Sequence, residues 1–175
     1  MAMAAGFPDG EELPVGETGE IVINSDMVAA GYWNKPEATA DTFRPTGLWT
    51  GDLGRRDERG YLYVVGRKSD MIISGGFNVY PAEIERVIAE HPGVDLVTVV
   101  GVPDPEWGET PVAVVVAKGV PDAGMEAALR THCRGNLAGY KQPRRFEFRD
   151  ELPLGPAGKI LKREVRASLL DAAEQ

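Results

Sequence analysis

Apolar residues follow two different spacings along the chain. Residues 94–102 and 110–117 are nearly continuous apolar runs, which is typical of buried strands. Residues 20–23, in which a glutamate precedes three apolar residues, and residues 61–65 are shorter segments near turn residues, and residues 145–148 alternate apolar and polar side chains. All of these segments are predicted to be strands, and 110–117 is apolar enough to lie in the centre of a sheet.

Later segments place apolar residues at helical spacing instead. One begins at Pro81 and is ended by His91-Pro92-Gly93, and another covers residues 161–170. A short helix is also predicted over residues 36–43, because Pro36 suits the first turn of a helix. The apolar stripes are Ile84, Val87 and Ile88; Met125, Leu129, Cys133 and Leu137; and Val165 and Leu169.

The pattern changes at Gly66. Residues 1–65 contain little predicted helix and few large apolar residues per strand, so this part needs a further surface on which to pack. Residues 70–175 alternate predicted strands and helices. The sequence therefore predicts an α+β fold, in which a small mixed domain with a short sheet and three helices follows a β-rich part.

Composition limits the compartment and the partners. The chain has one cysteine, which excludes an intramolecular disulfide, and no apolar run approaches the ~20 residues of a membrane helix. A net charge of -8 argues against a nucleic-acid partner, which requires a basic surface. We expect a cytoplasmic protein without a membrane span, in which Cys133 is a small buried hydrophobe rather than a nucleophile.

Residues 66–85 combine a charged cluster, a short apolar run, a double glycine and a helix start. This combination suggests a moving part of an enzyme. Gly75 and Gly76 have no Cβ, so the backbone can closely approach a ligand chain there. The alternative is a simple hairpin turn, in which glycine is the usual residue.

Two residues are candidates for binding a ribose. Asp52, in Trp49-Thr50-Gly51-Asp52, could accept hydrogen bonds from two adjacent hydroxyls, although Gly-Asp is also ordinary turn chemistry. Arg67 follows a strand and can donate a fork of hydrogen bonds toward a ribose or a phosphate. The alternative for Arg67 is a surface ion pair with Asp70 or Asp57.

A lysine lies near the tip of a Gly/Pro-rich loop, Pro153-Leu154-Gly155-Pro156-Ala157-Gly158-Lys159-Ile160. The glycine spacing and the terminal Lys-Ser/Thr of a phosphate-binding P-loop are missing. Lys159 could be a mobile cation that neutralises charge developing on a phosphate. The alternative is a solvated loop lysine.

Together these segments resemble the carboxyl-terminal part of the acyl-adenylate-forming superfamily, which includes acyl-CoA synthetases, peptide-synthetase adenylation domains and firefly-type luciferases. The resemblance covers nearly the whole chain, and the segments occur in the family order. Residues 76–85 look most like fatty and aromatic acyl-CoA ligases. The segments that carry the resemblance are residues 16–21, 31–37, 49–52, 66–85, 102–104, 107–109, 140–141 and the Lys159 loop.

The resemblance implies an AMP-forming acid–thiol ligase, which converts a carboxylic acid, ATP and CoA into acyl-CoA, AMP and pyrophosphate. By similarity, Asp52 would hold the ribose of ATP or AMP and Arg67 would support it. Lys159 would be the catalytic residue that faces the carboxylate and the α-phosphate during adenylation. After a domain rotation, Lys159 would leave, and the backbone of Gly75 and Gly76 would line the CoA channel.

The resemblance also implies a hinge at residues 67–69. The family's pivot position usually holds Asp or Lys, and here it holds Ser69, flanked by a lysine and an aspartate. Serine permits the same backbone change. We therefore expect residues 1–66 to be the β-rich end of a large amino-terminal domain and residues 70–175 to be the mobile carboxyl-terminal domain.

The family's amino-terminal domain supplies a phosphate loop, the acyl pocket and a metal-binding glutamate, and none of these occurs in the sequence. Residues 16–19 precede a strand but lack the Ser/Thr-rich run and the lysine of that loop. We expect the chain to be inactive alone, with the missing domain as its partner and open strand edges that permit a homo-oligomer. Magnesium would bind in the complete enzyme, with no metal ligand in this chain, and the acyl substrate is not encoded here.

A second hypothesis is a non-catalytic module that binds CoA or pairs with a separately encoded amino-terminal half. The exposed face expected on the β-rich part motivates this alternative. An adenylation domain of a peptide synthetase is disfavoured, because that class usually carries an Arg-Ile-Glu-type continuation where this chain has residues 77–81.

Overall fold

The computed structural model describes residues 2–6, 11–121 and 123–172 of the 175-residue chain. The chain divides into two compact units, Met1–Ser69 and Asp70–Gln175. Each unit contains one sheet.

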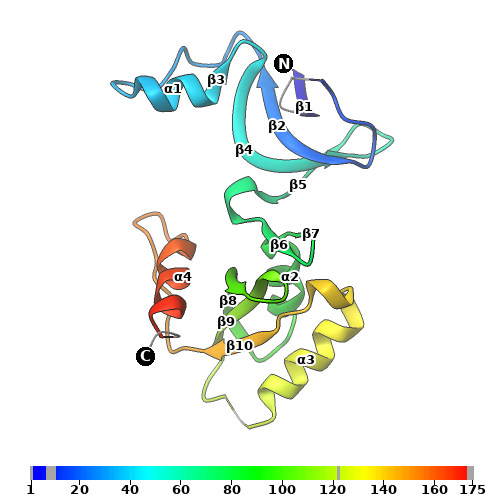
Figure 1. The fold of residues 1–175 in the computed structure, drawn as a ribbon, viewed down its shortest axis with the longest axis vertical. Helices are drawn as coiled ribbons and strands as arrows, with labels where there is room; N and C mark the ends of the chain where they lie inside the picture. Colours follow the sequence, from blue (N-terminus) through cyan, green and yellow to red (C-terminus); the bar gives the residue numbers. More distant parts are fainter. Residues whose placement is uncertain (1, 7–10, 122, 173–175) are drawn as a thin grey trace. The chain divides into compact units, whose positions relative to one another are not determined.

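The first unit is an antiparallel sheet with one short helix (Figure 1). The strand order is β1-β2-β4-β3, and β5 pairs with the second half of β4. Its elements are β1 (Ala2–Gly6), β2 (Thr18–Asn24), α1 (Pro36–Thr42), β3 (Phe43–Arg44), β4 (Gly47–Arg56) and β5 (Leu62–Arg67).

The apolar core of the first unit is small. Ile21 of β2 and Trp49 and Leu53 of β4 are buried, whereas Trp33 is 95% exposed. A Cβ on Gly54 would lie 2.9 Å from the Ile21 side chain, so this glycine permits the close packing of the two strands. The unit therefore buries few large side chains, as its composition predicts.

The Gly51-Asp52 pair is typical of a turn, but in the structure it lies inside the ten-residue strand β4. The β2–β4 pairing shifts register between Glu20 and Val22. Gly51 takes up this irregularity with a φ of 73°, and its N–H donates to Glu20 Oε1 at 3.0 Å. A bulge, rather than a chain reversal, therefore explains the Gly-Asp pair.

The second unit is a mixed sheet covered by three helices. Strands β8 and β9 form a long antiparallel hairpin, β10 pairs with β9 in parallel, and the β6–β7 hairpin pairs with the start of β9. The elements are η1 (Lys68–Asp70, across the unit boundary), β6 (Ile72–Ser74), β7 (Phe77–Val79), α2 (Pro81–Ala89), β8 (Val94–Asp104), β9 (Gly108–Ala117), α3 (Met125–Asn136), η2 (Gly139–Lys141), β10 (Arg145–Phe148) and α4 (Lys162–Asp171).

Strand β9 is central, and its side chains alternate between two cores. Ala113 and Val115 belong to the core with α2 and α3, whereas Val112, Val114 and Val116 belong to the core with α4. Figure 1 shows α3 and α4 on opposite sides of this sheet. Burial on both faces explains why the run is apolar at every position.

The predicted α+β fold class is confirmed, including the short sheet with three helices in the second unit. Strands β8 and β9 continue beyond their predicted ends, because Asp104 Oδ1 closes their turn by accepting from the N–H groups of Glu106 and Trp107, both at 2.9 Å. The stripe residues lie on α2, α3 and α4, apart from Leu137, which directly follows α3. All are buried as predicted: Ile84, Val87, Ile88, Met125, Leu129, Cys133, Leu137, Val165 and Leu169.

Cys133 is a core residue and is 1% exposed. Burial raises the pKa of its thiol, against an opposing effect of the Arg130 charge. The side chain therefore packs as a small hydrophobe, as expected. No helix in the described parts of the chain has the length and apolar character required to cross a membrane.

Candidate functional site

Asp52 and Arg67 meet at the boundary end of the first sheet. They occupy directly opposed positions of the β4–β5 ladder, and Arg67 Nε donates to Asp52 Oδ1 at 2.9 Å. Both side chains remain accessible, at 36% for Asp52 and 63% for Arg67. Arg67 therefore pairs with Asp52, the other ribose candidate.

Glu20 supports this pair from the neighbouring strand. Its side chain is 9% exposed and accepts from Lys68 Nζ at 2.8 Å. Its other carboxylate oxygen accepts from the N–H of Gly51, immediately before Asp52. Sequence reasoning assigned Glu20 no role, although a carboxylate directly before the apolar run 21–23 was a signal that it has buried partners.

Ser69 is the last residue of the first unit, and it lies in the short 3₁₀ helix η1. The residues on either side of it bind within different units. Lys68 contacts Glu20 of the first unit, whereas Asp70 Oδ2 lies 3.9 Å from Lys162 Nζ of the second. Each unit thus anchors its own side of Ser69.

Gly75 and Gly76 form the two-residue turn of the β6–β7 hairpin. Both have positive φ, at 56° and 82°, which is the geometry of a tight hairpin turn. Gly75 N–H donates to the backbone carbonyl of Trp107 at 2.9 Å. A Cβ on Gly75 would lie 2.5 Å from the indole ring of Trp107. The hairpin interpretation therefore holds, and the exposed loop remains available for close approach of a ligand.

Aromatic and cationic side chains surround this hairpin. The ring of Phe77 stacks on Tyr140 with centroids 4.7 Å apart, and the Arg144 guanidinium lies 4.7 Å from the Trp107 ring centroid. Phe77 is 54% exposed. Sequence reasoning gave these four residues no individual role, because they come together only when three loops fold beside one another.

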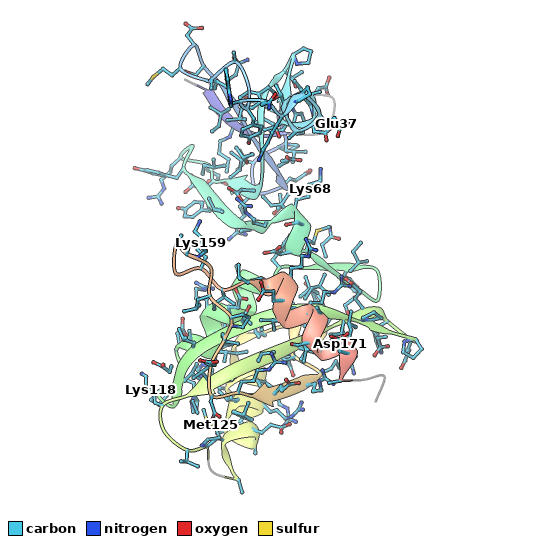
Figure 2. All side chains as sticks on the ribbon, turned by 90° about the vertical axis from the view of Figure 1, so that its left-hand side faces the viewer. Glu37, Lys68, Lys118, Met125, Lys159 and Asp171 are labelled. Carbon is cyan, nitrogen blue, oxygen red and sulfur yellow. The ribbon has the colours of Figure 1, made fainter. Side chains whose placement is uncertain are left out.

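Lys159 lies on an exposed loop before α4 (Figure 2). A β-bridge between Leu154 and Ile160 closes the loop, and Gly155 N–H donates to the Lys159 carbonyl at 2.8 Å. Gly158 has a φ of 72°, which turns the chain just before the lysine. No described residue forms an ion pair with Lys159, so its ammonium is available to a ligand.

The predicted site residues thus form distinct groups. Asp52 and Arg67 are in direct contact in the first unit, whereas Gly75, Gly76 and Lys159 lie on two separate loops of the second. Within the described residues, no group of three or more His, Cys, Asp or Glu side chains is arranged to hold a metal ion. The arrangement comprises an accessible Asp–Arg ion pair, a glycine hairpin turn and an exposed loop lysine.

Comparison with known proteins identifies related chains. A family model described as "AMP-binding enzyme C-terminal domain" matches residues 83–159. The chain is 49% identical over 169 residues to 2-succinylbenzoate–CoA ligase from Geobacillus kaustophilus, covering 95% of this chain and 34% of the relative. It is 48% identical over 158 residues to a long-chain-fatty-acid–CoA ligase from Escherichia coli, covering 90% of this chain and 28% of the relative.

A solved structure shows the same fold. The o-succinylbenzoate CoA synthetase from Bacillus subtilis matches with a TM-score of 0.87 and 38% identity, covering 94% of this chain and 33% of that one. It was solved with its acyl-adenylate intermediate and also with ATP and magnesium. The present chain spans about a third of the length of these relatives. It belongs to the AMP-forming acyl-CoA ligase superfamily, of which it represents the carboxyl-terminal portion.

Proposed function

We propose that the chain supplies the nucleotide-contacting edge and the mobile domain of an AMP-forming acid–thiol ligase. Residues 1–66 would be the end of the large domain, residues 67–69 the hinge, and residues 70–175 the mobile domain. The observation that carries this proposal is the Asp52–Arg67 contact of 2.9 Å, placed directly before the unit boundary at Ser69.

Asp52 would bind the ribose of ATP or AMP. A carboxylate can accept hydrogen bonds from both hydroxyls of a ribose. Arg67 would hold the plane of that carboxylate and add a positive charge near the nucleotide. Glu20 would keep the backbone before Asp52 in place through the N–H of Gly51.

Lys159 would act in the first chemical step. In that step a carboxylate oxygen of the acid attacks the α-phosphorus of ATP, and the bond to pyrophosphate breaks. Negative charge builds on the phosphate oxygens, and an ammonium without a competing ion pair stabilises it. The exposed position of Lys159 in the loop supports this role.

The Gly75–Gly76 hairpin would act in the second step. CoA thiolate attacks the acyl carbon of the adenylate, and AMP leaves. A loop without Cβ atoms lets the pantetheine chain pass close to the backbone. The neighbouring Arg144–Trp107 and Phe77–Tyr140 contacts support CoA binding here, because rings stack on adenine and a guanidinium pairs with phosphate.

Rotation about Ser69 would exchange the two loops. Lys68 and Asp70, anchored in different units, would leave Ser69 to absorb the change in φ and ψ. Magnesium would bind with ATP in the complete enzyme. We assign no acid substrate, since relatives at 49% and 48% identity are named for a succinylbenzoate and for long-chain fatty acids.

This stretch of 175 residues is proposed to be inactive alone, because it contains no Ser/Thr/Gly-rich phosphate loop. We also propose a cytoplasmic location, from the single thiol, and self-association through the exposed apolar residues of the first unit, such as Trp33 and Met27. Light scattering should show a mass above the monomer that falls on dilution, and a strict monomer at high concentration would contradict this.

Pyrophosphate exchange over a panel of carboxylic acids tests the activity claim. The chain alone should give no exchange above the level of a Lys159→Ala variant. Robust exchange by the wild-type chain, lost in that variant, would overturn the claim of inactivity while supporting the role of Lys159. Robust exchange that is equal in the wild-type chain and the variant would overturn both the claim of inactivity and the role of Lys159.

A further inference from the structure

Lys162, the first residue of α4, is held by two carboxylates. Its Nζ lies 2.7 Å from Glu85 Oε1 and 3.9 Å from Asp70 Oδ2. The side chain is 25% exposed, so it is partly shielded from water. The ammonium thus joins the start of α4 to α2 and to the first residue of the second unit.

This position is unusual for a cation. The amino terminus of a helix carries a partial positive charge, so a lysine there is disfavoured unless a carboxylate compensates it. The residue before it, Leu161, makes no side-chain cap. The ion pair with Glu85 supplies the negative charge that compensates Lys162 at the first turn of α4.

Glu85 is itself fixed. The same carboxylate oxygen, Oε1, accepts from the N–H of Val99 at 2.8 Å and from the hydroxyl of Thr98 at 3.2 Å. Thr98 is fully buried in β8. Lys162 is therefore tied to a rigid partner and not to a free surface carboxylate.

The body of α4 has separate anchors. Val165 and Leu169 are buried against the sheet, and Arg166 donates to the Gly101 carbonyl at 2.8 Å and to Glu109 at 2.7 Å. These contacts do not involve Lys162, so we expect the body of the helix to stay in place when the Lys162 contact is removed. The Lys162 contact lies instead at the end of the helix from which the Lys159 loop emerges, and it ties that end to α2.

Only two residues separate Lys159 from Lys162. The loop returns on itself through the Leu161 N–H, which donates to the Pro153 carbonyl at 2.9 Å, and through the Gly155 N–H on the Lys159 carbonyl. Both hydrogen bonds involve residues directly before α4, so their geometry depends on the position of the first residue of that helix. A shift of the first helical turn would therefore move the Lys159 backbone directly.

We propose that Lys162 is a positioning residue for Lys159, and that its pairing with Glu85 and Asp70 holds the Lys159 loop in register with α2 and with the start of the second unit. A role of Lys162 in catalysis rests on the proposed function, whereas its effect on the position of the loop does not. The same ammonium would carry a change at Asp70, next to Ser69, to the catalytic loop.

Amide hydrogen exchange by NMR on the full chain tests this proposal. Lys162→Met keeps the length of the side chain and removes its charge. We expect exchange at Gly155 and Leu161 to become at least about tenfold faster, with no change in strand β9. Arg163→Met is the matched control, because it removes a cation from the next, exposed position of the same helix and should leave both rates unchanged.

Lys162→Arg should restore most of the protection, since a guanidinium can pair with Glu85. The proposal is overturned if Lys162→Met leaves the loop rates unchanged, if it speeds β9 equally, or if Arg163→Met has the same effect. Titration of AMP and CoA into the wild-type chain separates the two claims. A failure to bind either ligand would count against the proposed function and leave the exchange result intact.

Discussion

Asp52 and Arg67 face each other across the β4–β5 ladder, with Arg67 Nε 2.9 Å from Asp52 Oδ1. The pair is exposed enough to add little to folding stability. Removing the pair should therefore lower the affinity for the nucleotide and leave the free energy of unfolding nearly unchanged. Because the two effects can be measured separately, a variant of Asp52 can test the proposed ribose contact directly.

Asp52→Asn removes the charge and one acceptor. Because hydrogen bonds to charged groups are strong, AMP affinity should fall about tenfold or more, with a small change in the free energy of unfolding. Calorimetric titration and urea denaturation measure the two quantities. Asp41→Asn, an exposed aspartate of α1, serves as control; equal affinity in the Asp52 variant and the control would exclude Asp52 from the nucleotide contact.

Gly75→Ala should destabilise the second unit more than Gly76→Ala. Both positions have positive φ, which costs an alanine about 1–2 kcal/mol. A Cβ on Gly75 would also lie 2.5 Å from Trp107, whereas one on Gly76 would meet no atom within 4 Å. Urea denaturation followed by NMR signals of β9 measures the difference, and equal loss in both variants would show that the contact with the Trp107 ring does not matter.

Cys133 should be almost unreactive toward a thiol reagent in the folded chain. Burial raises its thiol pKa, so the neutral thiol is favoured in the fold. The stabilisation this provides is present below the unfolded pKa and is lost as pH rises through the folded one. Labelling at about pH 8 should be slow until urea unfolds the second unit; fast labelling without unfolding would contradict the burial of this residue.

Asp57 should titrate below the usual range of an aspartate. Slight burial raises its pKa, but hydrogen bonds from the backbone of Tyr61, the hydroxyl of Tyr63 and the backbone of Arg59 lower it by more. Because the folded pKa is depressed, the stabilisation is present above the unfolded pKa and is lost as pH falls through the folded one. Carboxyl NMR titration measures the pKa, with Tyr63→Phe expected to raise it; an unchanged value in that variant would exclude the hydroxyl as a cause.

Periodicity predicted the second unit more fully than the first. Strand β9 and helix α2 each bury a regular set of side chains, so the run 110–117 and the stripe Ile84, Val87 and Ile88 marked them. Strand β4 was not predicted, because its glycines interrupt the apolar pattern. Its pairing with β2 depends on long-range contacts that no local spacing reports.

In the candidate site, too, local sequence features were predicted and long-range contacts were not. Asp52, Arg67 and Lys159 were singled out by residue type and motif. The ion pairs that support their surroundings were not, because the Glu20–Lys68 and Glu85–Lys162 contacts join residues far apart in the sequence. A charged residue in an apolar stretch, such as Glu20, signals a buried partner without identifying it.

Residue-resolved NMR titration of the chain with CoA directly tests the assignment of the Gly75–Gly76 hairpin to the CoA channel. We predict localised shift changes at Gly75, Gly76, Phe77 and Tyr140, with an affinity weaker than ~100 μM because the large domain would supply the remaining contacts. Gly75→Ala should reduce these changes. Affinity tighter than that value would favour an independent CoA-binding module, and scattered or absent shifts at millimolar CoA would contradict the assignment of the hairpin to the CoA channel.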